Sequence, residues 1–159
     1  MIEITKSQTA DTRTSDSVVE KEQLLLSSIQ HIQDVSKALH WMASELMRIA
    51  ENHDYTKIDN ISEFFVDFRA IQEGRLGDFK NAHWFKDIHL QERHHLTDSV
   101  PEDVNLFDVL ERIADCVMAG MGRSGTVYPD ELSADVLMEA FHNTYALLKS
   151  QVVVTEAEK

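Results

Sequence analysis

Apolar residues recur every three or four positions over a long stretch early in the chain. The stretch starts near Leu25, runs to a break at Asn52, and contains neither Gly nor Pro. Such spacing is typical of one stripe on a helix. The stripe consists of Ile32, Val35, Leu39, Met42, Leu46 and Ile49. We therefore predict one long helix that packs lengthwise against other helices or against a second subunit, which favours a homo-oligomer.

Helical spacing returns in four later segments, at residues 64–71, 78–96, 106–117 and 130–148. Asn60 followed by Glu63 resembles a capping box, and Asp78 can cap the helix that it opens. The segment at 106–117 has a broad apolar face, so we expect it to be buried on more than one side. The Gly-rich run at 120–125 should end it. No segment shows convincing strand alternation. The pattern predicts an all-α fold, a single-domain bundle of about five helices with a long N-terminal helix.

The two ends of the chain lack this periodicity. Residues 1–19 are rich in Thr and Ser, and we expect a flexible tail there and another at residues 151–159. Residues 20–150 would form the helical domain. A chain of 159 residues with 43% apolar residues is long enough to bury a core as one domain.

Charge and cysteine content exclude several classes of function. The formal net charge of −13 argues against binding to duplex nucleic acid or to anionic lipid, both of which depend on clustered Lys and Arg. Cys116 is the only cysteine, so no intrachain disulfide is possible. No apolar run approaches a membrane span, and the N-terminus does not resemble a signal peptide. We therefore expect a cytoplasmic protein.

Most of the histidines follow the end of the long helix. His53 and Asp54 are adjacent there, with Lys57 three residues later. The later candidates are His83, His89, His94, His95 and Asp115, the last within an apolar segment. Imidazole and carboxylate together suit Zn, Mn, Fe, Co or Ni, and a buried Asp needs a partner. The set predicts a site for a divalent transition metal.

Each member of this set also has an ordinary interpretation. A single histidine is more often a surface residue or a satisfied core residue than a ligand, and we assign His40 and His142 to that class. Asp115 could pair with Arg112 or Arg123 instead of a metal. The ordered combination of a His-Asp pair, further histidines and a lone Asp is what favours the metal site.

This ordered set resembles the HD superfamily of metal-dependent phosphohydrolases, which are all-α. The resemblance is carried by His53-Asp54 with Lys57, by His89 and His94-His95, and by Asp115. Residues 31–35 are also similar to the first-helix signature of that family. The stretch from His31 to about Gly125 further resembles an uncharacterised group of phage and bacterial proteins, which implies a fold and no activity. A phage-encoded chain would act in the host cytoplasm.

The resemblance implies that an upstream histidine, the doublet and the distant aspartate hold the metal. The metal ligands would be His31, His53, Asp54, His89, His94 and Asp115. One of them conflicts with the predicted long helix. His31 and His53 are 22 residues apart, which is about 33 Å in a continuous helix, too far to share one ion. Either that helix bends, or His31 serves another site in an oligomer.

The resulting hypothesis is a metal-dependent phosphohydrolase acting on a small phosphate ester, possibly a nucleotide. A bound metal would activate water and polarise the phosphoryl oxygen. Lys57, Lys86 and Arg93 are candidates to hold phosphate oxygens, and Glu92 or His95 could relay a proton.

Three alternatives remain open. The first is a non-catalytic protein on the same scaffold that sequesters a nucleotide or a host factor. The second is a helical interaction module with incidental histidines. The third is an all-α nucleotide pyrophosphohydrolase, since Glu111 and Asp115 share a helix face, although the paired Glu-x-x-Glu of that family is not evident.

Overall fold

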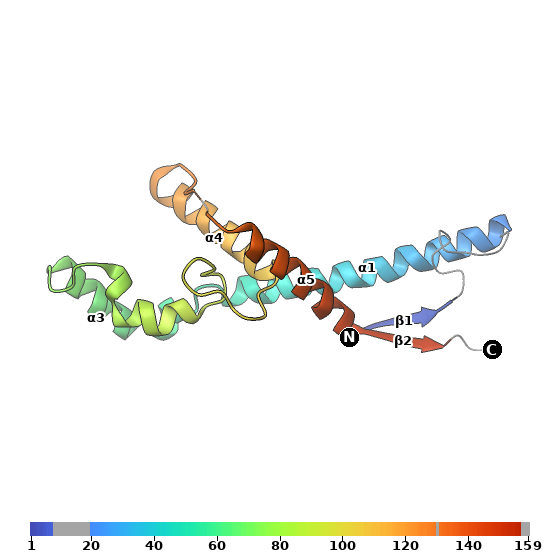
Figure 1. The fold of residues 1–159 in the computed structure, drawn as a ribbon, viewed down its shortest axis with the longest axis horizontal. Coiled ribbons are helices and arrows are strands. Elements are labelled where there is room, and N and C mark those ends of the chain that lie inside the picture. Colours follow the sequence, from blue (N-terminus) through green and yellow to red (C-terminus); the bar gives the residue numbers. More distant parts are fainter. Residues whose placement is uncertain (8–19, 130, 157–159) are drawn as a thin grey trace. The chain divides into compact units, whose positions relative to one another are not determined.

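The computed structural model describes residues 1–7, 20–129 and 131–156. The prediction of a mostly helical fold with a long N-terminal helix is confirmed (Figure 1). The α-helices are α1 (Lys21–Asn52), α2 (Thr56–Asp59), α3 (Ile61–Gln72), α4 (Leu106–Ser124) and α5 (Ala134–Gln151). Two strands are also present, β1 (Ile2–Lys6) and β2 (Val152–Glu156). Most of the predicted N-terminal tail, residues 8–19, the last three residues and Asp130 lie outside the described residues.

The chain divides into two compact units. The first comprises Met1–Met47 and Tyr145–Lys159, and the second comprises Arg48–Thr144. Residues 20–150, which the sequence pattern predicts as one domain, contribute to both units in the structure. Among the described residues, no helix combines the length and the apolar character that crossing a membrane requires.

The first unit contains a strand pair that the sequence pattern did not predict. β1 and β2 are parallel, with Ile2 opposite Val152 and Lys6 opposite Glu156. Two side chains of α1 hold β1, since Gln30 donates to the Thr5 carbonyl at 2.7 Å and Lys37 donates to the Glu3 carbonyl at 2.9 Å. The expectation of no strand is wrong because five-residue strands are stabilised by their partner, and here the partner lies about 150 residues away.

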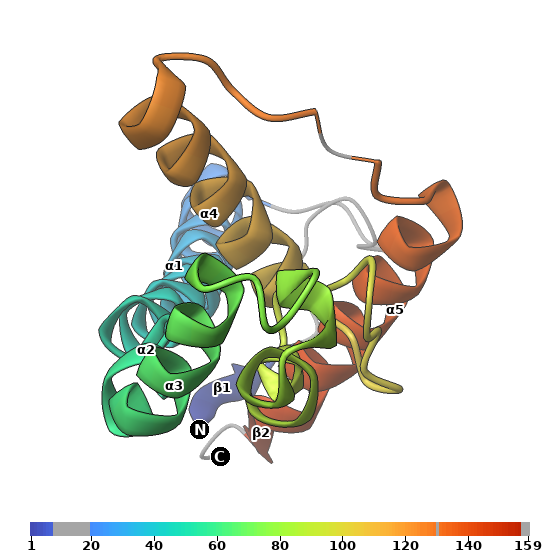
Figure 2. The same cartoon turned by 90° about the vertical axis from the view of Figure 1, so that its left-hand side faces the viewer.

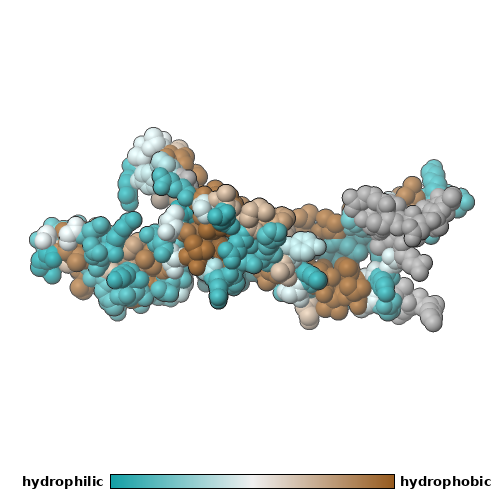
Figure 3. Space-filling model, viewed as in Figure 1, coloured by the Kyte–Doolittle hydropathy of each residue, from teal (hydrophilic) through white to brown (hydrophobic). Residues whose placement is uncertain are grey.

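Few side chains of the first unit are buried. Ile2 is 5% exposed, whereas Ile32 and Leu39 of the predicted α1 stripe are 65% and 59% exposed. Apolar atoms also reach the surface over the two-stranded sheet, where Val153 and Val154 lie (Figure 3). The predicted homo-oligomer stays a prediction.

The second unit has an apolar core around the start of α4. Leu96, Val104, Val109 and Ala140 are buried together there, and Leu106, Leu132 and Val136 pack against them. A second packed region is aromatic, where Trp84 stacks on Phe64 with ring centroids 4.1 Å apart. Phe64 belongs to α3, which lies beside α2 (Figure 2).

The single helix predicted for residues 78–96 is wrong. The structure has three short turns instead, η2 (Phe79–Asn81), the π-helical η3 (Trp84–Ile88) and η4 (His89–Gln91). Asp78 does cap η2, accepting from the Lys80 amide at 3.0 Å. The chain leaves helical geometry because the side chains of this segment are drawn into two packed groups, the aromatic one at Trp84 and a polar one described below. A π-turn inside such a segment frequently marks a functional site.

The position of α4 is fixed at both ends. Asn105 and Asp108 form a reciprocal capping box at its start, and Gly125 ends it with φ 72°. The capping box predicted at Asn60 does not form, since the Asn60 side chain makes no cap hydrogen bond. The expectation that α4 is buried on more than one side is also wrong, because Leu110 and Ile113 are 46% and 49% exposed. Its polar face carries part of the site instead.

Candidate metal centre

A sharp turn after α1 brings His53 and Asp54 to the same place. Adjacent residues of a helix point about 100° apart, so these two could not converge within one. α1 ends at Asn52, and Asp54 has φ 55°, in the left-handed region that costs energy for residues other than Gly and is best tolerated by Asn and Asp. His53 Nε2 then lies 3.4 Å from Asp54 Oδ2. Strained backbone of this kind is concentrated at functional sites.

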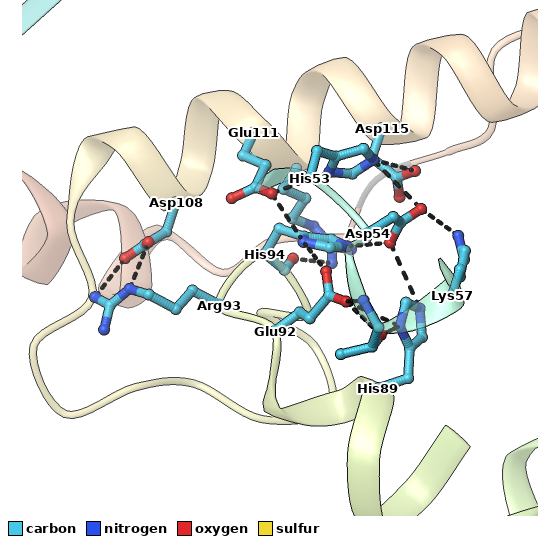
Figure 4. A network of polar contacts seen from close by, with 12 residues as sticks. His53, Asp54, Lys57, His89, Glu92, Arg93, His94, Asp108, Glu111 and Asp115 are labelled. Atoms are coloured by element: carbon cyan, nitrogen blue, oxygen red, sulfur yellow. Dashed lines mark hydrogen bonds and ion pairs between the residues drawn. The ribbon is translucent and has the colours of Figure 1, made fainter. Parts of the chain in front are cut away.

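Six further side chains gather around this doublet, and the eight residues together form the histidine–acid cluster, all but His95 being labelled in Figure 4. The structure groups them as His53 with His94 and Glu111, Asp54 with His94 and His95, His53 with Asp54 and Asp115, and Asp54 with His89 and Glu92. In each group the candidate ligand atoms lie within 4.8 Å of one another. All eight residues belong to the second unit. The groups overlap through Asp54, His53 and His94, so they form one continuous site.

Asp54 is the centre of the cluster. Its Oδ2 accepts from the Lys57 ammonium, while its Oδ1 lies 3.7 Å from His89 Nε2 and 3.6 Å from His94 Nε2. Oδ1 is buried and has no hydrogen-bond partner within the described part of the chain. The two carboxylate oxygens therefore face different neighbours, one a cation and the other two imidazoles.

Two acidic side chains of α4 close the opposite side. Glu111 and Asp115 are one helical turn apart and project toward the histidines (Figure 4). Glu111 Oε1 lies 2.9 Å from His53 Nδ1 and 3.2 Å from His94 Nδ1, and Asp115 Oδ1 lies 3.7 Å from His53 Nε2. Glu111 is not among the ligands predicted from the sequence. Its spacing of four residues before Asp115 was the signal that could have found it.

Thr56 and Glu92 form a small network behind His89. Glu92 Oε1 accepts from the Thr56 amide at 3.1 Å and contacts the Thr56 hydroxyl, and that hydroxyl lies 2.9 Å from His89 Nδ1. All three residues are buried. Nothing in the sequence pattern distinguishes Thr56, since a lone threonine beside a charged pair has no characteristic spacing.

The aromatic region of the second unit supports the same histidine. The His89 ring stacks on Trp84 with centroids 4.6 Å apart and planes 15° apart, and Trp84 is fully buried. This packing fixes the plane of the imidazole and removes it from water.

Burial and neighbouring charge shift the protonation of the cluster. Burial lowers the pKa of His89 to about 4, against the opposing effect of Asp54. Burial, together with His94 and His89, also lowers the pKa of His95 to about 4. Both rings are therefore neutral at neutral pH and hold a lone pair that a metal can use.

Three other groups stay charged more readily because of their partners. Burial would lower the pKa of His94, but Glu111, Asp54 and Asp115 together outweigh burial and raise that pKa. Burial would raise the pKa of Asp54, but Lys57 and the neighbouring histidines lower it. The pKa of Glu111 is likewise lowered by His94 and His53 against the effect of burial. The carboxylates are thus ionised and available as ligands.

These residues fit a transition metal. Asp54 Oδ1, His94 Nε2 and His95 Nε2 are buried and lack hydrogen-bond partners among the described residues, and their three residues form one of the groups. Buried polar atoms almost always have a hydrogen-bond partner, so three neighbouring atoms without one need an explanation, which a shared metal ion would supply. Ligand atoms at about 2.1 Å from one ion lie about 3.4 Å apart in tetrahedral geometry, close to the 3.6 Å and 3.7 Å at Asp54.

Lys57 contacts the cluster through Asp54, whereas four other candidates, His31, His83, Lys86 and Arg93, belong to none of its groups. His31 is exposed on α1 in the first unit, and Lys86 is exposed on η3. Neither belongs to any of the four groups found among the described residues. Arg93 belongs to a separate ion pair. Its Nε and Nη2 donate to the two oxygens of Asp108 at 2.8 Å each, and its Nη1 donates to Asp103 at 2.9 Å. The guanidinium thereby ties the loop after η4 to the start of α4.

Comparisons with protein-family models, with curated proteins and with solved structures each find no match for this chain. None of them identifies a relationship to the HD superfamily, so that resemblance stays a prediction. Support for a metal centre therefore comes from the geometry of the second unit.

Proposed function

We propose that the histidine–acid cluster binds a divalent transition metal and that the protein uses it to hydrolyse a small phosphate ester, with nucleotides as the leading candidates. The observation that carries the proposal is the surroundings of Asp54 Oδ1. A buried carboxylate oxygen faces two imidazole nitrogens at 3.6 Å and 3.7 Å and has no hydrogen-bond donor of its own in the described chain. A cation at that position would use all three atoms.

The mixture of ligands favours a transition metal over Mg²⁺ or Ca²⁺. Those two ions prefer oxygen ligands, whereas Zn, Mn, Fe, Co and Ni accept imidazole together with carboxylate. The cluster offers four imidazoles, from His53, His89, His94 and His95. A buried carboxylate is costly to keep ionised without a partner. A bound divalent ion would supply that partner, and the carboxylates would balance its charge.

The cluster has a buried side and a more open side, as catalytic metal sites do. The His89 and His94 side chains are 4% and 2% exposed, whereas those of His53 and Asp115 are 33% and 30% exposed. A bound divalent ion lowers the pKa of water and polarises a phosphoryl oxygen. Lys57, whose side chain is 41% exposed beside Asp54, would donate to a phosphate oxygen of the substrate.

A second candidate is a metal-dependent binding protein that does not turn over its ligand. The observation in its favour is that two of the three predicted phosphate donors do not contact the cluster. Arg93 is engaged by Asp108 and Asp103, and Lys86 belongs to no metal group among the described residues. Of the three predicted donors, Lys57 is therefore the one in contact with the cluster. This candidate predicts ligand retention with no product.

Elemental analysis of protein purified without chelator or nickel affinity tests the metal. Asp54→Asn keeps the size and the backbone preference of the residue and removes its negative charge. Asp59→Asn, at an exposed position of α2, is the matched control. We expect near-stoichiometric transition metal in the wild type and the control, and loss of metal in Asp54→Asn with unchanged helical circular dichroism.

Phosphate release from nucleoside monophosphates would then be measured on the same three proteins. Turnover that survives in Asp54→Asn contradicts the phosphohydrolase proposal. Absence of metal in the wild type, even after reconstitution with Mn, Co or Zn, contradicts the metal centre itself.

A further inference from the structure

The two ring nitrogens of His89 have different surroundings. Nδ1 lies 2.9 Å from the Thr56 hydroxyl oxygen, and Nε2 lies 3.7 Å from the buried Oδ1 of Asp54. A neutral imidazole carries one proton, and only the nitrogen without it has a lone pair for an ion. The position of that proton therefore decides whether Nε2 can act as a ligand.

The Thr56 hydroxyl has one proton to donate and two acceptors to choose from. Its oxygen contacts Glu92 Oε1, which also accepts from the Thr56 amide at 3.1 Å. Because Glu92 Oε1 already acts as the acceptor for the Thr56 amide, the adjacent hydroxyl proton is directed toward the same oxygen. The Thr56 oxygen then faces His89 with its lone pairs, and it accepts from a protonated Nδ1.

We propose that Thr56 and Glu92 are positioning residues that hold His89 as its Nδ1–H tautomer and so direct the Nε2 lone pair at the metal position beside Asp54. The proposal rests on the metal centre proposed above. Groups behind a metal-binding histidine commonly fix its tautomer and orientation in this way. The role differs from the proton relay predicted for Glu92.

The same geometry shows what Thr56 prevents. In the other tautomer, Nε2–H would point toward Asp54 Oδ1, an acceptor 3.7 Å away that has no donor within the described residues. A shift of a few tenths of an ångström would bring the two groups into hydrogen-bond distance, and the lone pair would be lost to the site. The stack on Trp84 fixes the ring plane but not the proton, because stacking does not distinguish the two nitrogens.

The test is a nitrogen-15 NMR spectrum of the histidine side chains in the metal-free protein at neutral pH. Two-bond and three-bond couplings identify which ring nitrogen is protonated, with His89 assigned through a His89→Gln variant. We expect the Nδ1–H tautomer in the wild type and in Thr56→Ser, which keeps the hydroxyl. In Thr56→Val we expect a shift toward Nε2–H.

A matched control separates this effect from the loss of a buried hydroxyl in general. Thr144 is also buried, and its hydroxyl accepts from the Leu106 amide and donates to the Ala140 carbonyl, each at 2.7 Å. Thr144→Val should leave the His89 tautomer unchanged. Titration with Co²⁺ should show about 10- to 100-fold weaker binding in Thr56→Val than in Thr144→Val and Thr56→Ser.

The outcomes distinguish the two proposals. A wild-type His89 in the Nε2–H form, or a tautomer that does not change in Thr56→Val, overturns the positioning role even if metal binds. Equal Co²⁺ affinity in Thr56→Val and Thr144→Val overturns its contribution to the site. A wild type that holds the Nδ1–H tautomer but binds no Co²⁺ or Zn²⁺ supports the tautomer assignment and overturns the metal centre.

Discussion

Oδ1 of Asp54 lies 3.6 Å from Nε2 of His94, and neither atom has a hydrogen-bond partner in the described part of the chain. Both atoms are buried from bulk solvent. Leaving buried polar atoms unpaired costs about 1–3 kcal/mol each. Two such atoms side by side therefore destabilise the metal-free protein, and a cation bound between them would offset this destabilisation.

The proximity of Trp84 to His89 gives a direct optical test of ion binding. The two rings are stacked 4.6 Å apart, and Trp41 is the other tryptophan of the chain. In a Trp41→Phe background, Ni²⁺ or Co²⁺ should quench the Trp84 fluorescence, and the quenching should saturate along a single-site binding curve. The same titration of Asp54→Asn in that background is the control. Equal quenching in both proteins would show that the ions do not bind at Asp54.

The left-handed backbone at Asp54 predicts a specific order among its substitutions. With φ 55°, an alanine at this position is disfavoured relative to glycine by about 1 kcal/mol. We expect Asp54→Gly to be more stable than Asp54→Ala in chemical denaturation, with both variants losing the metal. At Asp59, in helical backbone of α2, the order of the same two substitutions should reverse. An alanine variant more stable than the glycine variant at position 54 contradicts the turn.

Lowered histidine pKa values predict how the metal-free protein responds to acid. His89 and His95 have pKa values of about 4 in the folded protein and the ordinary 6.5 when unfolded. Between these values the unfolded state binds more protons, so the free energy of unfolding should fall as pH falls from 6.5 to 4. His94, whose pKa is raised, is charged in both states over most of this window and adds little slope there.

Urea denaturation in the presence of chelator measures that slope. His95→Gln should reduce it, because one of the two neutral histidines is removed. A free energy of unfolding that stays constant from pH 6.5 to 4 in the wild type would contradict the burial of His89 and His95.

The ion pair of Arg93 predicts a structural defect more than a catalytic one. Asp108 is 2% exposed, and Arg93→Ala would leave its carboxylate with the Asn105 amide as the remaining donor that the structure shows. We expect a loss of roughly 2–4 kcal/mol, less than for a fully buried pair because the Arg93 side chain is 41% exposed. Arg69→Ala, which breaks an exposed pair with Glu73, should cost much less, because solvent screens such a pair. Similar losses in both variants would contradict this assignment.

The periodicity of apolar residues determined the helical content of this protein. The stripe from Ile32 to Ile49 predicts α1, and the pattern around Leu137 and Phe141 predicts α5, because a helix places residues three and four apart on one face. Local signals also worked where one residue supplies the physics, as with Gly125, whose left-handed φ ends α4. The sequence likewise pointed to the histidines and acids as one set, since their residue types alone carry the chemistry.

Tertiary structure decided which of those residues meet. The turn at Asp54, the breakdown of residues 78–96 into short turns, and the i,i+4 face of Glu111 and Asp115 bring the cluster together from three segments. Thr56 enters the site only through contacts with Glu92 and His89, more than thirty residues away. The pairing of β1 with β2 is likewise non-local. Side-chain packing and hydrogen bonds between distant segments overrule local propensity at such places, and a single sequence carries no record of which segments will pair.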